Sequence, residues 1–277
     1  MASTNAICNL CNQTILELLD FKLLLRYVTG FNQVELITKN EYELSQDELV
    51  KLNNLVARRQ KGEPLHYILG YKEFYSREFR VTPDTLIPRP ETELLVDKVL
   101  SIAIPNARLL DLGTGSGCIA VACKLENPNL DVVAVDKYSD TLEVACTNAI
   151  QLGAKIKCIL SDWFSNVDGL FDVIVSNPPY IAHDDVHLGS LQFEPQHALT
   201  DNLDGFSHIK QIIRGSIAHL KKGGYLLFEH GFEQGEMSRK LLHNAGFIDI
   251  ETIQDYASLD RITLGKYTLR NSNASSI

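Results

Sequence analysis

The sequence contains no run of about 18 apolar residues, which is the length that a membrane-spanning helix requires. Its first residues also lack the basic stretch followed by an apolar segment that marks an export signal. These two absences predict a soluble protein that stays in the cytoplasm and does not bind a membrane.

Cysteine is scarce, and its spacing gives no metal site. The six cysteines are scattered along a chain too large to need disulfide bonds for stability, so we expect reduced thiols. Cys8 and Cys11 form a CxxC pair, but no second CxxC or histidine pair follows at zinc-finger spacing. We therefore interpret this pair as incidental.

An excess of basic charge is also absent. The chain has 26 Lys and Arg against 35 Asp and Glu, and the excess of acidic residues lies entirely after residue 90. Proteins that bind duplex DNA or RNA usually gain affinity by neutralising phosphates with Lys and Arg. We therefore expect no direct nucleic-acid partner.

Apolar periodicity divides the chain into three segments. Residues 1–70 have helical spacing, with a capping box at Ser45 and Glu48, and are expected to form a small domain that recognises the substrate. Residues 71–90 alternate apolar and polar positions, which favours a β-hairpin linker. Residues 91–277 alternate short apolar strands with helices, which predicts an α/β domain with a doubly wound, mostly parallel sheet. Residues 271–277 are predicted to be a frayed tail.

A glycine-rich loop lies between a predicted strand and a predicted helix. After Asp111 and Leu112 it consists of Gly113, Thr114, Gly115, Ser116 and Gly117. The glycines allow positive φ and let a ligand approach the backbone. Nicotinamide and flavin proteins use similar turns, but their usual spacing is GxGxxG around a pyrophosphate. The GxGxG spacing and the acidic residue that opens the motif favour S-adenosylmethionine, which has an amino group and a sulfonium but no phosphate.

Two further residues are placed to complete a cofactor site. Asp136 ends the next strand, where its carboxylate could accept hydrogen bonds from both ribose hydroxyls. Trp163 follows Asp162 after the third strand and could contact the adenine face. The simpler alternatives are that Asp136 caps the helix beginning near Ser139 and that Trp163 fills the core.

The loop Asn177-Pro178-Pro179-Tyr180 follows another strand, at the end of the sheet where doubly wound folds place their sites. An amide nitrogen is a poor nucleophile because it shares its lone pair with the carbonyl. The Asn177 side-chain oxygen and the Pro178 carbonyl could accept from its two N–H groups, and Tyr180 could stack on the planar group. This loop predicts methyl transfer to a planar amide or amino nitrogen, without a metal.

A group of potential metal ligands follows immediately. His183, Asp184, Asp185 and His187 resemble a metal cluster in composition. We interpret them as part of a loop that covers the substrate, and we expect no metal.

Longer stretches narrow the prediction. After about residue 45 the chain resembles the glutamine N5-methyltransferases that act on peptide chain release factors, the PrmC/HemK family. The resemblance rests on the glycine loop, on the Asn177 loop and on three further stretches: Glu63–Gly70 (EPLHYILG), Leu86–Glu93 (LIPRPETE) and Phe193–Pro195 (FEP) with Ala198 and Leu199.

The resemblance implies a helical domain, a short β linker and a Rossmann-like class I methyltransferase domain. Its substrate would be the glutamine of the Gly-Gly-Gln loop in a release factor. Residues Gly113–Gly117, Asp136, Trp163 and Asn177 would then bind the cofactor, and residues 177–180 would hold the glutamine. Arg89 and Glu93 would support the site or contact the substrate. Without the resemblance, these two would simply belong to a helix N-terminus that begins with Pro90.

Three alternatives remain at this point. The same loop chemistry serves N6-adenine and N4-cytosine DNA methyltransferases, which act on a flipped base. Methylation of a glutamine in a ribosomal protein is a closer alternative. A nucleotide-binding scaffold without catalysis is the third, and the intact Asn-Pro-Pro-Tyr loop disfavours it.

Overall fold

The computed structural model describes residues 5–268, apart from the side chain of His187. The chain divides into two compact units, Met1–Tyr71 and Lys72–Ile277, each with its own core. The predicted frayed tail, residues 271–277, lies outside the described residues. Within residues 5–268, no helix is long and apolar enough to cross a membrane.

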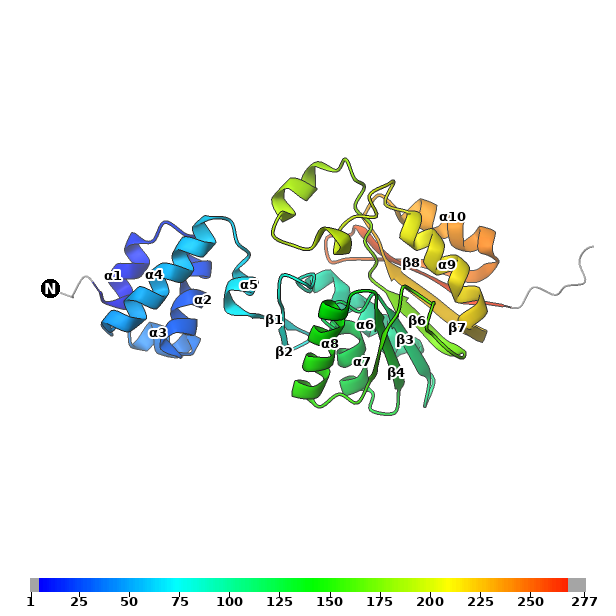
Figure 1. Cartoon of the computed structure of the whole chain (residues 1–277), viewed down its shortest axis with the longest axis horizontal. Helices are drawn as coiled ribbons and strands as arrows, with labels where there is room; N and C mark the ends of the chain where they lie inside the picture. Colours follow the sequence, from blue (N-terminus) through cyan, green and yellow to red (C-terminus); the bar gives the residue numbers. More distant parts are fainter. Residues whose placement is uncertain (1–4, 269–277) are drawn as a thin grey trace, which may run out of the picture. The chain divides into compact units, whose positions relative to one another are not determined.

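The first unit is helical, as its periodicity predicted (Figure 1). Its helices are α1 (Ile7–Gln13), α2 (Leu18–Thr29), α3 (Gln33–Thr38), α4 (Gln46–Gln60) and α5 (Leu65–Leu69). The predicted capping box is present: Ser45 Oγ accepts from Glu48 N, and the Glu48 carboxylate accepts from Ser45 N. The core is formed mainly by leucines of α2, α4 and α5. Burial of these apolar side chains holds the short helices together.

The second unit contains a seven-stranded sheet with the order β5-β4-β3-β6-β7-β9-β8. Its strands are β3 (Arg108–Leu112), β4 (Asp131–Asp136), β5 (Lys157–Leu160), β6 (Phe171–Ser176), β7 (Leu220–Glu229), β8 (Phe247–Gln254) and β9 (Asp260–Tyr267). Strands β3 to β7 pair in parallel, whereas β9 pairs antiparallel with both β7 and β8. The predicted α/β fold with a mostly parallel, doubly wound sheet is therefore confirmed.

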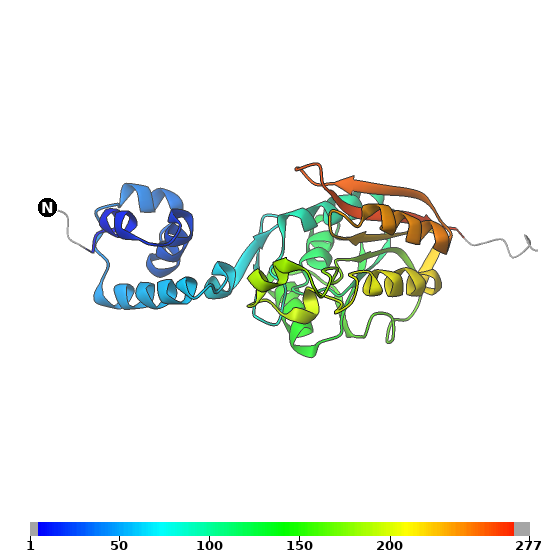
Figure 2. The same cartoon turned by 90° about the horizontal axis from the view of Figure 1, so that it is seen from above.

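Helices cover both faces of this sheet, because successive residues of each strand point to opposite sides. Leu109 belongs to one core, together with residues of α6 (Glu93–Ile102), α7 (Cys118–Glu126) and α8 (Ser139–Leu152). Leu110 and Leu112 belong to the other core, with α9 (Ser207–His219) and α10 (Gly235–Ala245). Figures 1 and 2 show α9 and α10 side by side. Short 3₁₀ helices occur at η1 (Pro90–Thr92), η2 (Val186–Leu191) and η3 (Gln196–Ala198).

The predicted β linker is a short hairpin of β1 (Tyr71–Phe74) and β2 (Arg77–Arg80). Phe74 and Phe79 are fully buried in the core of the second unit, with ring centroids 5.9 Å apart. The buried Asn148 side chain of α8 hydrogen-bonds both the N–H and the carbonyl of Arg80. These contacts make the hairpin part of the second unit, and residues 81–89 continue from it without regular structure.

The sheet changes direction between β3 and β6. From β3 the chain winds outward to β4 and β5, and from β6 it winds the other way to β7. In such folds, ligands bind at the carboxyl ends of the strands on either side of this point. The hydroxyl of Ser176, the last residue of β6, donates to the carbonyl of Leu112, the last residue of β3, at 2.7 Å. The glycine loop and the Asn177 loop therefore start from adjacent, linked strand ends.

Candidate active site

The glycine loop joins β3 to α7, and its backbone requires glycine. Gly113, Gly115 and Gly117 have φ of 68°, 58° and 81°, as the spacing predicted. A Cβ on Gly117 would lie 3.1 Å from the Ala145 backbone, so this glycine also allows α8 to pack closely. A Cβ on Gly115 would meet nothing within 4 Å, because this residue faces the pocket.

The acidic residue that opens the motif does not reach the pocket. Asp111 is fully buried, and its Oδ2 accepts from the Thr114 hydroxyl at 2.7 Å and from Ala120 N at 3.3 Å. Burial raises its pKa to about 7. The sequence argument that this residue suits the cofactor's amino group was wrong. Asp111 instead supports the loop and the first turn of α7 from below.

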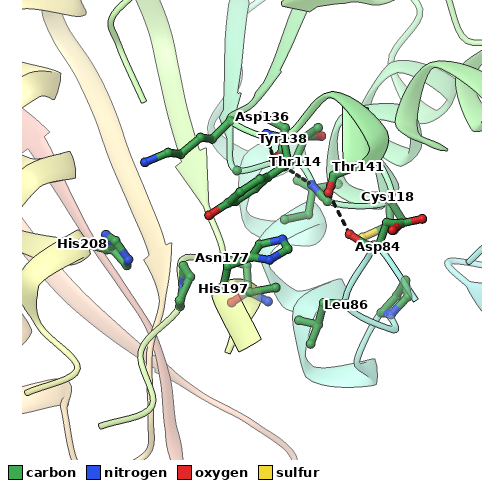
Figure 3. A pocket seen from close by; sticks show the side chains of 18 of the residues that line it. Asp84, Leu86, Thr114, Cys118, Asp136, Tyr138, Thr141, Asn177, His197 and His208 are labelled. Atoms are coloured by element: carbon green, nitrogen blue, oxygen red, sulfur yellow. Dashed lines mark hydrogen bonds between the residues drawn. The ribbon is translucent and has the colours of Figure 1, made fainter. Parts of the chain in front are cut away.

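Asp136, at the end of β4, joins the glycine loop to the start of α8. Its Oδ2 accepts from Gly115 N at 3.0 Å and its Oδ1 from Tyr138 N at 3.1 Å. The side chain lines the pocket, as Figure 3 shows, although only 7% of the residue is exposed. Burial raises the pKa of this carboxyl. Asp136 lies in the pocket wall, and it does not cap α8, because the N-cap residue of this helix is Tyr138 and no side chain caps it.

The pocket extends along the carboxyl ends of β3, β4 and β6 (Figure 3). Trp163 lies in its wall with a positive φ of 49°, and its ring is 5.3 Å from that of His208 between centroids. On another part of the wall, the rings of Tyr138 and His197 are 3.8 Å apart between centroids. Burial lowers the pKa of both histidines, which favours their neutral forms.

Of the Asn177 loop, Asn177 and Pro179 line the pocket, whereas Pro178 is buried. The Asn177 Nδ2 donates to the Thr92 hydroxyl at 3.2 Å. Tyr180 is partly buried, and its hydroxyl donates to Glu229 Oε1 at 3.0 Å. The Thr92 hydroxyl donates to the other oxygen of the same carboxylate at 2.7 Å. The loop is thus fixed at two points, at Asn177 by Thr92 and at Tyr180 by Glu229.

Arg89 and Glu93 have different surroundings. Arg89 lines the pocket and forms a 2.5 Å salt bridge with Glu194 of the Phe-Glu-Pro stretch. Glu93 is not among the pocket residues, and its carboxylate accepts from Tyr75 N at 2.7 Å in the hairpin turn. The structure therefore brings Arg89 to the site and shows Glu93 as a support for the hairpin.

Several pocket residues were missed because they come from distant segments. His197 lies between Phe193–Pro195 and Ala198, which carry the family resemblance, but no pattern in the sequence indicates it as a site residue. Tyr138 and His208 gave no signal in the sequence, and neither did Glu229, which is outside the pocket but holds its loop. Thr92 lies in the stretch Leu86–Glu93, but no pattern there singled it out.

The apparent metal cluster after Tyr180 has other contacts. The ring nitrogen Nδ1 of His183 lies 3.3 Å from the Leu203 carbonyl. Within residues 5–268, no group of three or more His, Cys, Asp or Glu side chains is arranged to hold a metal. Cys8 and Cys11 are free thiols in the first unit.

Two family models match the chain. Residues 13–70 match the PrmC N-terminal domain, and residues 90–193 match the methyltransferase small domain. A solved methyltransferase from Pyrococcus furiosus has a TM-score of 0.56 at 16% identity, covering 78% of this chain and all of its own. This likeness concerns the fold alone.

Curated relatives are much closer in sequence. The release factor glutamine methyltransferase of Neisseria gonorrhoeae is 46% identical over 90% of this chain and 93% of its own length. That of Escherichia coli is 43% identical over 90% of this chain and 91% of its own. Identity at this level over nearly the whole length shows that the chain belongs to the family of release factor glutamine methyltransferases.

Proposed function

We propose that this protein transfers a methyl group from S-adenosylmethionine to the side-chain amide nitrogen of the glutamine in the Gly-Gly-Gln loop of a peptide chain release factor. The observation that carries the proposal is the position of Asn177, whose side chain enters the pocket beside the glycine loop (Figure 3). The names of the close relatives supply the substrate class. Because release factors act on ribosomes, the proposal also places the protein in the cytoplasm.

The pocket suits S-adenosylmethionine. Asp136 uses its two oxygens for backbone N–H groups, but each carboxylate oxygen has two lone pairs, so capacity remains for ribose hydroxyls. Trp163 presents an aromatic ring for the adenine, and Gly115 leaves room for close approach. When bound, the cofactor supplies an electrophilic methyl group on a sulfonium.

The chain's own residues orient the amide nitrogen. The Asn177 Nδ2 faces Thr92, which leaves Oδ1 to accept one N–H of the substrate amide. The Pro178 carbonyl, held in a rigid Pro-Pro segment, is our candidate acceptor for the second N–H. These acceptors place the lone pair toward the methyl group and stabilise the positive charge that develops on nitrogen. The proton can leave after transfer, so no strong base is needed.

The other activities considered receive no comparable support. No feature of the described residues favours DNA or a ribosomal protein as substrate, and both curated relatives above are named for release factors.

The test is methylation with isotopically labelled S-adenosylmethionine, followed by mass spectrometry of the release factor. We expect label on the glutamine of the Gly-Gly-Gln peptide and none on a release factor in which that glutamine is alanine. Duplex DNA and ribosomal proteins are assayed in parallel. Label there, and none on the release factor, would overturn the substrate assignment.

A further inference from the structure

Glu229 is a buried carboxylate at the end of β7 whose two oxygens both serve the catalytic loop. Only 1% of the residue is exposed. Its Oε2 accepts from the Thr92 hydroxyl at 2.7 Å, and its Oε1 accepts from the Tyr180 hydroxyl at 3.0 Å. Strand β7 pairs in parallel with β6, and Phe228 is opposite Ser176. This register places Glu229 beside the start of the Asn177 loop.

The Thr92 hydroxyl connects this carboxylate to Asn177. A hydroxyl has a single proton, and here it is donated to Glu229. Toward Asn177 the Thr92 oxygen can therefore only accept a hydrogen bond. Only the Nδ2 of Asn177 is a donor, so the amide must turn its NH₂ group to Thr92, at 3.2 Å, and its Oδ1 away from it.

The direction of the Asn177 amide matters because its oxygen and nitrogen have opposite hydrogen-bonding roles. With Oδ1 toward the substrate, Asn177 accepts an N–H of the amide that is to be methylated. After a half-turn the NH₂ group would face the substrate nitrogen, and two donors would confront each other. The Asn177 side chain can thus accept the substrate N–H reliably only if its neighbours fix the orientation of its amide.

We infer that Glu229 and Thr92 are positioning residues for methyl transfer: Glu229 fixes the Thr92 proton, and Thr92 thereby fixes the Asn177 amide with its oxygen toward the substrate. The inference rests on the proposed function, because it assumes that a substrate N–H is the partner of Oδ1. Glu229 also holds the Tyr180 hydroxyl, so one carboxylate sets both ends of the Asn177–Tyr180 loop.

A purely structural role makes a different prediction. If Glu229 and Thr92 only stabilised the fold, their loss would lower the melting temperature and affect cofactor binding and turnover together. A positioning role predicts lower kcat with little change in cofactor affinity. Glu229 is not among the pocket residues, and Thr92, although it lines the pocket, uses its hydroxyl for Glu229 and Asn177.

Thr92→Val and Thr92→Ser form a matched pair. Valine keeps the shape of threonine but has no hydroxyl, whereas serine keeps the hydroxyl. We expect Thr92→Val to lower kcat about 30- to 100-fold and Thr92→Ser to stay within about threefold of wild type. Cofactor affinity, measured by calorimetry, should change less than about threefold in both. Equal kcat in the two variants would overturn the inference.

Glu229→Gln provides an independent test, including the case in which Thr92→Val does not fold. Thr92 and Tyr180 donate to different oxygens of the Glu229 carboxylate, so the glutamine NH₂ group must face one of the two hydroxyls, where it cannot accept. If its NH₂ faces Thr92, the threonine proton turns to Asn177 and the amide reverses. We expect a loss of kcat similar to that of Thr92→Val, and little further loss in the double variant because the residues act in series. If the loss of kcat in the double variant equals the product of the losses in Thr92→Val and Glu229→Gln, the two residues do not act in series.

A readout that does not require turnover separates this inference from the proposed function. In protein labelled with ¹⁵N-asparagine, the Asn177 NH₂ protons should show nuclear Overhauser effects to the Thr92 side chain, and these should disappear in Glu229→Gln. If the wild type shows them but does not methylate release factor, the proposed function fails and the orientation stands. If an active wild type lacks them, the inference fails.

Discussion

Glu194 and Arg89, separated by 105 positions in the sequence, form a 2.5 Å salt bridge at the wall of the pocket. The Glu194 side chain is 3% exposed and also accepts from Ile87 N at 3.2 Å. The carboxylate thus joins the segment before α6 to the segment that contains His197. Both segments line the pocket, so this contact closes one side of it.

Removal of this carboxylate should open that wall. Glu194→Ala leaves the Arg89 charge and the Ile87 N–H without their acceptor, at a cost of about 1–3 kcal/mol, since Arg89 remains partly exposed to water. We expect a lower melting temperature and a several-fold weaker affinity for S-adenosylmethionine. Glu236→Ala, which breaks an exposed pair with Lys240, is the control and should change neither. If Glu194→Ala and Glu236→Ala have the same melting temperature and the same affinity for S-adenosylmethionine, Glu194 has no role in the wall.

Asp111 should make stability depend on pH. Its pKa is about 7 in the folded protein, against about 3.9 in an unfolded chain. The folded state therefore binds the proton more tightly, and this stabilisation is complete below about pH 4 and lost as the pH rises to about 7. Asp111→Asn cannot ionise, so its melting temperature should increase relative to wild type between about pH 5 and about pH 8. If the difference in melting temperature between Asp111→Asn and wild type is the same at every pH, the ionisation of Asp111 does not affect stability. Asp168→Asn, at an exposed position, is the control.

The two units and the glycine loop could be predicted because their signals are local. Helical spacing, strand-length apolar runs and alternate glycines each depend on neighbouring residues. The capping box at Ser45 and the positive φ of the glycines up to Gly117 are both present in the structure. The role of Asp111 was misjudged, although the alternation of β3 contained the information. Asp111 and Leu109 point to the same side of the sheet, toward the core under α7.

The supporting contacts could not be predicted from the sequence, because they depend on register between distant strands. In the sequence, Glu229 is an acidic residue at the end of an apolar strand. No neighbouring residue in the sequence indicates Thr92 or Tyr180 as its partners. The pairing of β7 with β6 brings Glu229 beside the Asn177–Tyr180 loop, and Thr92 reaches the same carboxylate from η1. The same holds for His208, which reaches the pocket from α9.

Asn177 should affect turnover more than binding. Asn177→Ala removes the acceptor for the substrate N–H but leaves the glycine loop and Asp136 in place. We expect kcat to fall about 100- to 1,000-fold and cofactor affinity to weaken only modestly. Steady-state kinetics and calorimetry on one preparation measure both. The control is Asn129→Ala, at an exposed turn. Activity equal to wild type would remove Asn177 from the mechanism.

Tyr180 should act through its ring and not as a base. Burial and the neighbouring Glu229 carboxylate raise the pKa of its hydroxyl far above neutrality, so the phenolate does not form near pH 7. Tyr180→Phe keeps the ring and loses one hydrogen bond, for which we expect a loss of kcat below about tenfold. Tyr180→Ala should lose much more. If Tyr180→Phe is as inactive as Tyr180→Ala, the hydroxyl and not the ring is the essential group.

Trp163 offers a direct readout of cofactor binding, because it is the only tryptophan in the sequence and lines the pocket. Its emission should change as S-adenosylmethionine is added, and Trp163→Phe should show no such change. Asp136→Asn should shift the midpoint of the titration about tenfold, or about 1.4 kcal/mol. The reason is that asparagine has one acceptor oxygen and cannot serve Gly115, Tyr138 and the ribose together. Asp140→Asn, exposed on α8, should leave the midpoint in place. An unshifted midpoint in Asp136→Asn would exclude Asp136 from the ribose site, even if Trp163 still responds to the cofactor.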